Sequence, residues 1–360
     1  MKFDFAIGNP PYQTSIETYN RQEPIYTHFY DATEKVADKS LLITPARFLF
    51  NGGLTSKEWN KKMLSDEHLK VEYYNERAAD VFPTAQIKGG IAVVYRDSKQ
   101  KFGAIGEFIP NESLRKIASH FTNDKSKNLP SIMFGGRSDL KFNELFVKEN
   151  PESIYARIKA IQKKHPEVNE LAPNEEYELK SSTLEILGFL FESQMPAKGN
   201  GYYKILGLEN GKRVFKWIEK RYMEPRYPKK NNIDKYKVIF PEATGNGLLG
   251  ETLSTPTILE PMESATPTFI SIGKFDTKIE AEAALKYIKT KLVRALLGIL
   301  KKTQHTAPAN WAYVPLQDFT SASDIDWTKS IHEIDLQLYK KYGLTQEEID
   351  FIESNVKEME

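Results

Sequence analysis

Apolar and polar positions along the first hundred residues alternate between two periods. Four short apolar runs, at residues 3–7, 41–44, 71–75 and 91–95, have the length of strands. Between the first two runs, apolar residues recur at helical spacing and predict a helix over residues 24–38. Strands that alternate with helices are typical of an α/β sheet layer, so we predict one here.

The second half of the chain is predicted to end in helices that act as scaffold. A capping-box pair, Thr277 and Glu280, opens an amphipathic helix predicted over residues 278–301. A second pair, Thr345 and Glu348, opens a final helix with one apolar face.

The middle of the chain shows a weaker pattern, with helical spacing only at residues 153–164 and 182–191. We therefore predict three parts. An α/β layer over residues 1–125 is followed by a partly helical connector over residues 126–196. A mixed α+β domain with a helical C-terminus follows over residues 197–360.

Composition excludes several classes of protein. The chain has 360 residues, which is enough for two domains with sizeable cores. No apolar run approaches the ~18 residues that a transmembrane helix needs, and no secretory signal pattern opens the sequence. The absence of cysteine excludes disulfides, thiolate catalysis and cysteine-bound zinc. These features fit a cytoplasmic protein that does not contact a membrane.

Charge is unevenly distributed, although the net charge is only +1. Residues 198–237 contain twelve basic residues, four acidic ones and several interleaved aromatics. Such a stretch predicts a face that binds phosphates, and an ordinary β-rich domain with a solvated basic face is the alternative. The candidate DNA-binding residues are Lys212, Arg213, Lys216, Lys220, Arg221, Lys229 and Lys230.

The most distinctive chemistry lies at Asn9-Pro10-Pro11-Tyr12, directly after the first predicted strand. Pro10 restricts Asn9 to an extended conformation, so that the amide side chain follows the strand end. The Asn9 side-chain carbonyl and the Pro10 backbone carbonyl can accept hydrogen bonds from an amine on which charge develops. Tyr12 offers a flat face for a base extruded from a duplex. A plain strand-to-turn junction is the alternative.

This loop resembles the catalytic loop of adenine-specific (N6) DNA methyltransferases of type II restriction-modification systems, in the γ order with an Asn-Pro-Pro-Tyr motif. The segments Leu41–Leu49 and Asp80–Val94 are similar to later parts of the same catalytic domain. The resemblance implies that Phe82 contacts the flipped base opposite Tyr12, and a core phenylalanine is the alternative. Residues 198–237 resemble a target-recognition domain.

The resemblance also implies a partial Rossmann-like methyltransferase sheet and S-adenosylmethionine as the cofactor. In this family the cofactor-binding half precedes the loop, so with catalysis at Asn9 we expect that half to be missing and the cofactor site to be incomplete. The G-x-G-x-x-G spacing at Gly245, Gly247 and Gly250 does not replace it, because two prolines and no helical period follow.

The expected partners are double-stranded DNA and a chain that carries the cofactor-binding half or a nuclease. No metal site, His-Glu-x-x-His spacing or nucleophile elbow is apparent. The expected function is methyl transfer from S-adenosylmethionine to the exocyclic amine of a flipped adenine. The alternative is a non-catalytic DNA-binding specificity subunit, or an inactive fragment, of a restriction-modification enzyme.

Overall fold

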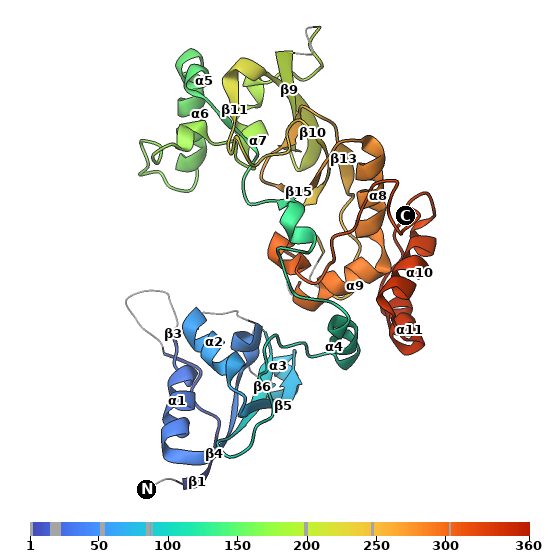
Figure 1. The fold of residues 1–360 in the computed structure, drawn as a ribbon. Helices are drawn as coiled ribbons and strands as arrows, with labels where there is room; N and C mark the ends of the chain where they lie inside the picture. Colours follow the sequence, from blue (N-terminus) through green and yellow to red (C-terminus); the bar gives the residue numbers. More distant parts are fainter. Residues whose placement is uncertain are drawn as a thin grey trace. The chain divides into compact units, whose positions relative to one another are not determined.

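The computed structural model describes residues 3–14, 23–50, 55–83, 87, 89–197, 201–245, 248–301 and 304–360 (Figure 1). The chain forms two compact units, Met1–Asn111 and Glu112–Glu360, each with its own mixture of strands and helices. The architecture is thus mixed α/β.

One mixed sheet organises the first unit. Its strands are β1 (Phe3–Gly8), β4 (Ala37–Pro45), β6 (Ile91–Asp97) and β5 (Leu69–Asn75), in the order β1-β4-β6-β5. β1 and β4 run parallel, whereas β6 is antiparallel to both of its neighbours. The four strands and the helix predicted over this region are confirmed.

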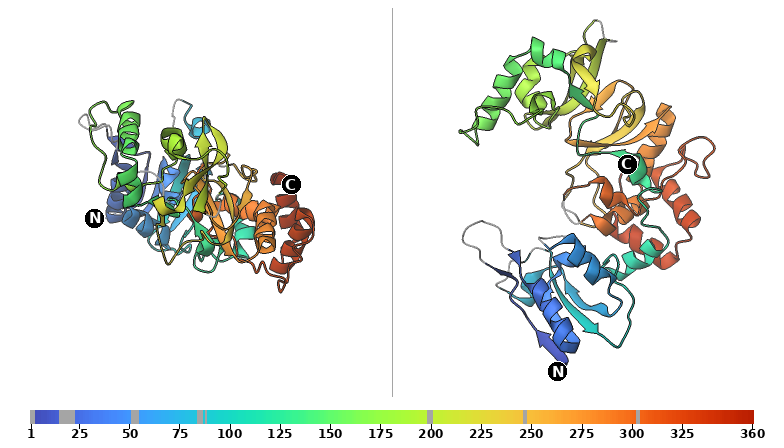
Figure 2. Two further views of the ribbon diagram at one scale, coloured as in Figure 1. Left: turned by 90° about the horizontal axis from the view of Figure 1, so that it is seen from above. Right: turned by 60° about the vertical axis from the view of Figure 1, so that its left-hand side comes forward.

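A parallel pair needs a crossover connection, and α1 (Tyr26–Val36) supplies it by packing along β4 (Figures 1 and 2). The remaining elements of this unit are β2 (Gln13–Thr14), β3 (Glu23–Pro24), the 3₁₀ helix η1 (Ala46–Phe50), α2 (Lys57–Ser65) and α3 (Ala78–Val81).

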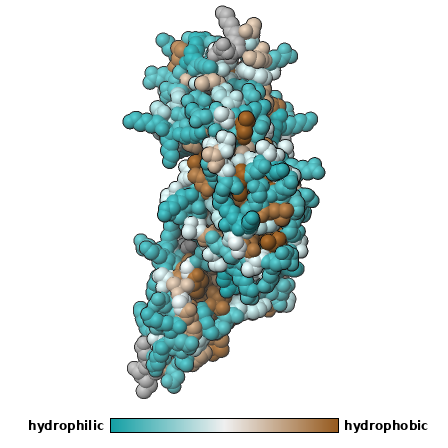
Figure 3. All heavy atoms as spheres, turned by 45° about the vertical axis from the view of Figure 1, so that its right-hand side comes forward, coloured by the Kyte–Doolittle hydropathy of each residue, from teal (hydrophilic) through white to brown (hydrophobic). Residues whose placement is uncertain are grey.

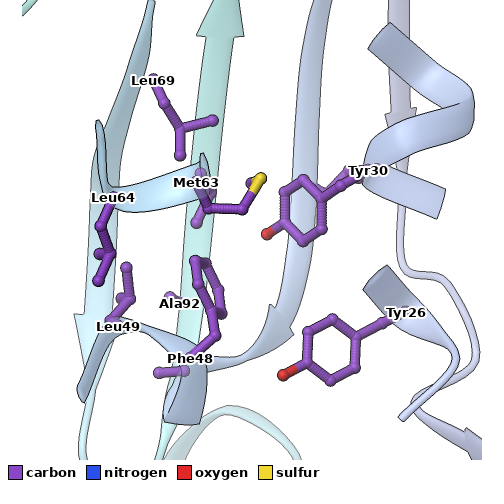
Figure 4. Close-up of a cluster of buried hydrophobic side chains, with 11 residues drawn as sticks. Tyr26, Tyr30, Phe48, Leu49, Met63, Leu64, Leu69 and Ala92 are labelled. Atoms are coloured by element: carbon purple, nitrogen blue, oxygen red, sulfur yellow. The ribbon is translucent and has the colours of Figure 1, made fainter. Parts of the chain in front are cut away.

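The core of the first unit is an aromatic cluster between the helices and one face of the sheet (Figure 4). Trp59 of α2 packs edge-on against Phe48 at 5.3 Å between ring centroids, and its ring centroid lies 5.8 Å from that of Tyr30. In contrast, Phe5 and Ile7 of β1 are 47% and 75% exposed. Hydrophobic side chains on the sheet face that the helices cover are therefore buried, whereas Phe5 and Ile7 on β1 remain exposed to solvent.

The second unit contains three sheets within its described residues. Their orders are β10-β9-β14, β11-β8 and β13-β12-β15-β7. The strands are β7 (Met133–Phe134), β8 (Leu140–Phe142), β9 (Tyr202–Glu209), β10 (Lys212–Glu219), β11 (Met223–Pro225), β12 (Tyr236–Pro241), β13 (Thr257–Leu259), β14 (Glu263–Ala265) and β15 (Phe269–Phe275).

The second unit also contains eight α-helices within its described residues. They are α4 (Glu112–Ser119), α5 (Glu144–Glu149), α6 (Glu152–Gln162), α7 (Thr183–Leu187), α8 (Lys278–Lys289), α9 (Lys291–Leu300), α10 (Ile331–Tyr342) and α11 (Gln346–Asn355). Of these, α7 contacts β9, and α8 contacts β12, β13 and β15. Short 3₁₀ helices are η2 (Leu129–Ile132), η3 (Glu175–Tyr177), η4 (Gly188–Leu190), η6 (Lys220–Tyr222) and η7 (Pro308–Trp311).

The structure differs from the prediction of a separate connector over residues 126–196. Phe142, Phe146 and Leu184 share one buried cluster with Ile205 and Ile218 of the β9–β10 hairpin. The segment thus contributes core side chains to the second unit instead of linking two domains. The boundary also lies at residue 111 instead of 125, because α4 packs against α9 and α11.

The helix predicted over residues 278–301 is two helices, α8 and α9. Thr290 interrupts it with an extended ψ of 151°. Its amide donates to the Tyr287 carbonyl at the end of α8, and its hydroxyl accepts from the Val293 amide at the start of α9. Asp335 of α10 accepts from the next two amides, those of Lys291 and Leu292. Side-chain acceptors thus compensate for the break by satisfying the first turn of α9.

The predicted capping boxes differ from one another. The box of Thr345 and Glu348 is complete. At α8 only half of the box forms, because the Glu280 carboxylate accepts from the amide of Asp276 instead of that of Thr277. The start of α8 is therefore fixed by two residues outside the helix.

We expect the stability conferred by Asp335 to depend on pH. Burial raises the pKa of its carboxyl to about 6. Because the folded pKa lies above the unfolded one, this contribution is fully present below about pH 4 and is lost as pH rises through 6. A difference of two pKa units corresponds to at most about 3 kcal/mol.

Asp335→Asn keeps a side-chain acceptor and removes the titration. In urea unfolding, its stability relative to the wild type should improve steadily between pH 4 and pH 7. A difference that stays constant across this range would contradict the role assigned to burial.

Candidate active-site loop and nucleic-acid interface

The Asn9-Pro10-Pro11-Tyr12 loop leaves the carboxyl end of β1. Gly8, the last residue of this strand, is paired with Leu42 of the parallel strand β4. Carboxyl ends of parallel strands are where α/β sheets commonly bind ligands. The pairing of β1 with β4 thus places the loop at an edge suited to a site.

Contacts on both sides hold the loop in place. Pro10 is buried, and the carbonyl of Tyr12 accepts from the amide of Ile25 at 3.2 Å, just before α1. Asn9 is exposed, and its side chain makes no hydrogen bond within the described part of the chain. A fixed backbone therefore presents a free amide side chain.

Tyr12 is only half-buried, but its hydroxyl lies inside the unit. That oxygen is buried and has no hydrogen-bond partner among the residues that the structure describes. Burial raises the pKa of Tyr12, and it also raises that of neighbouring Tyr26 to about 12. The hydroxyls of Tyr12 and Tyr26 both act electrostatically on Tyr30. The Tyr30 hydroxyl forms a hydrogen bond with the Thr44 hydroxyl at 2.9 Å. Tyr12 is therefore a neutral side chain with an unused donor.

Phe82 lies at the end of α3 and is half-buried. Its amide donates to the Ala78 carbonyl, which fixes the backbone there. Residues 84–86 and 88 of the segment that follows lie outside the described residues. Its contact with a base opposite Tyr12 stays a prediction.

The structure corrects the assignment of Lys216 to a DNA-binding face. This residue is 8% exposed, and its ammonium lies 2.6 Å from the Glu209 carboxylate. A buried, paired ammonium is not available to a phosphate. Lys216 and Ile218 lie two residues apart on β10, so both side chains face the same, buried side of the strand. This spacing is the sequence signal that indicates an inward position for Lys216.

Two arginines of the predicted face are already bonded to the protein. The guanidinium of Arg213 donates to the carbonyls of Ser254 and Thr255 at 2.8 and 2.7 Å. Arg221 forms ion pairs with Glu149 and Glu219, which raise its pKa further. Both arginines are exposed, but most of their guanidinium N–H groups already donate to carbonyls or carboxylates of this chain.

Other basic residues of the 198–237 stretch are internal. Arg226 makes a bidentate pair with Glu178, and Lys237 is 1% exposed and donates to backbone carbonyls. Burial lowers the pKa of Lys237 to about 8. Lys198 lies outside the described residues.

Four of the predicted lysines have no acidic partner within the described residues. Lys212, Lys229 and Lys230 are exposed, and Lys220 lies over the ring of Tyr203 at 5.5 Å. These four remain candidates for phosphate contact. Hydrophilic residues cover much of the face shown in Figure 3, with hydrophobic patches between them.

The glycine-rich segment does not fit a cofactor. Gly250 has a φ of +71°, and a Cβ there would lie 2.4 Å from the carbonyl oxygen of Asn355. The Gly250 carbonyl accepts from the amide of Lys357. The chain's own C-terminal segment thus occupies the space beside this glycine, and Gly247 lies outside the described residues.

The part of the chain that the structure describes contains neither a candidate metal cluster nor a candidate membrane span. No group of three or more histidine, aspartate or glutamate side chains is arranged to hold a metal ion there. No helix in that part of the chain is both long and apolar enough to cross a membrane.

Known proteins are similar to parts of this chain. Residues 1–82 match the family model described as Eco57I restriction-modification methylase. An uncharacterized adenine-specific methylase of Mycoplasma pneumoniae is 26% identical over 167 residues, which cover 45% of this chain and 37% of that protein. The chain therefore spans well under half the length of this relative.

A solved structure is similar over nearly the whole chain. The type IIL restriction-modification enzyme MmeI in complex with DNA has a TM-score of 0.41 and 9% identity, over 98% of this chain and 56% of that one. This likeness is too low to bear on function. The family match and the Mycoplasma relative confirm the resemblance to restriction-modification methylases that the loop predicts.

Removal of the buried hydroxyls of Tyr12 and Tyr30 should have different effects on the free energy of unfolding. An unpaired buried hydroxyl costs about 1–3 kcal/mol, so Tyr12→Phe should leave the free energy of unfolding unchanged or raise it. Tyr30→Phe breaks the bond to Thr44, which is fully buried, and should lower stability by about 1 kcal/mol. Urea unfolding of both variants measures the contrast. Equal destabilisation would show that Tyr12 has a partner.

Proposed function

We propose that this chain, whose residues 1–82 match the Eco57I restriction-modification methylases, supplies the catalytic loop of an adenine-specific DNA methyltransferase in a restriction-modification system. The observation that carries the proposal is the placement of Asn9. Its amide is exposed and unbonded within the described residues, on a backbone held by Pro10 and by the bond from Ile25 to Tyr12. The strand order β1-β4-β6-β5 supports a partial Rossmann-like sheet behind it.

In this proposal the chain's own residues bind and polarise the amine. The Asn9 side-chain carbonyl and the Pro10 backbone carbonyl accept from the two N–H groups of the adenine amine, and so stabilise charge that develops on nitrogen. Tyr12 and Phe82 hold the base on its two faces after it leaves the stack, which costs a few kcal/mol. The buried hydroxyl of Tyr12 takes no part in binding the amine.

S-adenosylmethionine would supply the methyl group. Because Gly250 is closed by the chain's own C-terminal segment, we assign no cofactor-binding residue to the glycine-rich loop. The exposed Phe5 and Ile7 on β1 support a partner polypeptide that covers this face and completes the cofactor site. A partner that carries a nuclease is equally compatible with this surface.

Double-stranded DNA is the proposed substrate, and the second unit is its proposed reader. Lys212, Lys220, Lys229 and Lys230 are available for phosphates, whereas Lys216 is not. The alternative is a non-catalytic specificity subunit. It predicts DNA binding that does not require Asn9 for any step.

Asn9→Ala should abolish most methyl transfer by the complete assembly and leave duplex binding nearly unchanged. Loss of one hydrogen-bonding group aimed at developing charge reduces the rate on the order of 10²–10³. Transfer of labelled methyl groups to duplex DNA measures this loss, and Gln13→Ala, an exposed neighbour, is the control. Full activity of Asn9→Ala would overturn the catalytic role.

Duplex binding should depend steeply on salt through the free lysines. Each phosphate contact contributes about 0.9 to the slope of log affinity against log salt, so Lys212→Ala, Lys229→Ala and Lys230→Ala together should reduce the slope by one to three units. Sequence discrimination should persist, since phosphate contacts position and base contacts specify.

Lys216→Met is the matched control for this experiment. It removes a positive charge from the same stretch, but from a buried pair with Glu209, so it should lower stability and leave the salt slope unchanged. Fluorescence anisotropy across a salt series measures both variants. If Lys216→Met flattened the slope and the triple variant did not, the assignment of the face would be wrong.

A further inference from the structure

The second unit contains an open cavity of about 350 Å³ that the proposed methyl transfer does not use. Most of its lining comes from the η2–β7 segment, the end of β15 and the irregular segment over residues 316–320, and Lys230 and Glu280 complete it. Its volume lies in the lower part of the range of about 300–1,000 Å³ that is typical of ligand sites. The cavity is therefore large enough for a single nucleotide base.

The floor of this cavity is aromatic and fixed. Phe275 and Phe319 pack edge-on with 5.5 Å between their ring centroids, and Phe319 also packs against Trp327 at 5.4 Å. Gly273 makes this possible, because its φ is +91° and a Cβ there would lie 2.1 Å from the Phe275 ring. Phe134, half-buried at the side, adds a third ring to the lining.

Two lysines and two acidic residues also line the cavity. Lys230 and Lys274 are exposed and form no direct ion pair among the described residues, although Lys274 acts electrostatically on Asp139. The ammonium of Lys274 lies 5.4 Å from the Phe134 ring centroid. Asp318 and Glu280 place two carboxyl groups at the same cavity. The amide of Thr320 donates to Asp318 and lowers its pKa, so this group is an acceptor only.

We propose that this cavity binds one unstacked nucleotide of a DNA strand. The base lies against Phe134 and the aromatic floor, and its exocyclic amine donates to Asp318 or Glu280, as carboxylates accept from cytosine in base recognition. Lys230 and Lys274 bind the adjoining phosphates. This inference rests on the proposed DNA binding, but it does not depend on methyl transfer or on the Asn9 loop.

Stacking and charge together exclude simpler occupants. A duplex with stacked bases presents no ring face to the aromatic floor, so a base must leave its neighbours to fill the cavity. An apolar peptide would leave the carboxylates and both lysines without partners, which is unfavourable for groups removed from water. An unpaired nucleotide matches the aromatic, acidic and basic parts of the lining with its base, its exocyclic amine and its phosphates.

Short single strands of deoxycytidine and of thymidine, labelled with fluorescein, are the probes, because thymine lacks an exocyclic amine. The full chain should bind the cytidine strand more tightly. Phe134→Leu keeps an apolar side chain but loses the stacking ring, and should weaken this binding about fivefold or more. Phe134→Tyr should restore it. Lys274→Ala should weaken binding of both strands.

Lys340→Ala, an exposed lysine of α10 that does not line the cavity, is the matched control and should leave single-strand binding unchanged. Thermal unfolding of each variant confirms that the fold is retained. Photocrosslinking of a strand that contains 5-iododeoxycytidine gives a second readout, with attachment expected within residues 131–134 or 316–320.

The inference is overturned if Phe134→Leu and Lys274→Ala bind single strands like the wild type, or if crosslinks map elsewhere. It is also overturned if deoxycytidine monophosphate competes as strongly as the strand, since the occupant would then be a free nucleotide. Duplex binding and methyl transfer are measured in parallel. If these persist while the cavity variants have no effect, only this inference fails, and the proposed function stands.

Discussion

The parallel pairing of β1 with β4 is the interaction on which the candidate site depends. It runs from Phe3 opposite Ala37 to Gly8 opposite Leu42, and it ends where Asn9 begins. The crossover helix α1 closes the same unit, because the amide of Ile25 just before it bonds to the carbonyl of Tyr12. One strand pair and one crossover thus fix both ends of a four-residue loop. Without that pairing, the two prolines would restrict the backbone but would not place it beside the sheet.

The aromatic core beneath the loop makes this placement rigid. Tyr26, Tyr30, Phe48 and Trp59 pack together between α1, α2 and the sheet, with Tyr30 bonded to Thr44 of β4. Tyr12 reaches toward this cluster with its hydroxyl, while Asn9 stays exposed. A loop that holds one side chain inward and another outward can bind a substrate group with little loss of conformational entropy.

In the second unit, many basic residues stabilise the fold instead of forming a surface. Arg226 with Glu178 joins segments that are distant in sequence. Lys216 with Glu209, and Lys237 with the carbonyls of Asn232 and Lys235, stabilise a hairpin and a turn that are local in sequence. Removal of one partner from a buried pair typically costs about 3–5 kcal/mol. A count of charges in the sequence therefore overestimates the surface that phosphates can reach. The available lysines lie at Lys212, Lys220 and the turn of Lys229 and Lys230.

Sequence alone determined the features that depend on local periodicity. The four strands of the first unit, α1 and the capping box of Thr345 and Glu348 follow from side-chain spacing and short-range hydrogen bonds. The Asn9-Pro10-Pro11-Tyr12 motif likewise identified the family resemblance, because its chemistry is contiguous in the chain.

Tertiary structure decided whatever depends on contacts between distant segments. Thr290 breaks a periodic helix because Asp335, on another helix, satisfies the freed amides. Residues 126–196 join the second unit because their apolar side chains complete the core of the β9–β10 hairpin. Lys216 is internal and pairs with Glu209 on the other strand of that hairpin, although the residue directly opposite it is Ile205. For Thr290 and residues 126–196, the stabilising partner is distant in sequence and has no signature in the local pattern. Lys216 differs, because its two-residue spacing from Ile218 in the sequence already indicates an inward position.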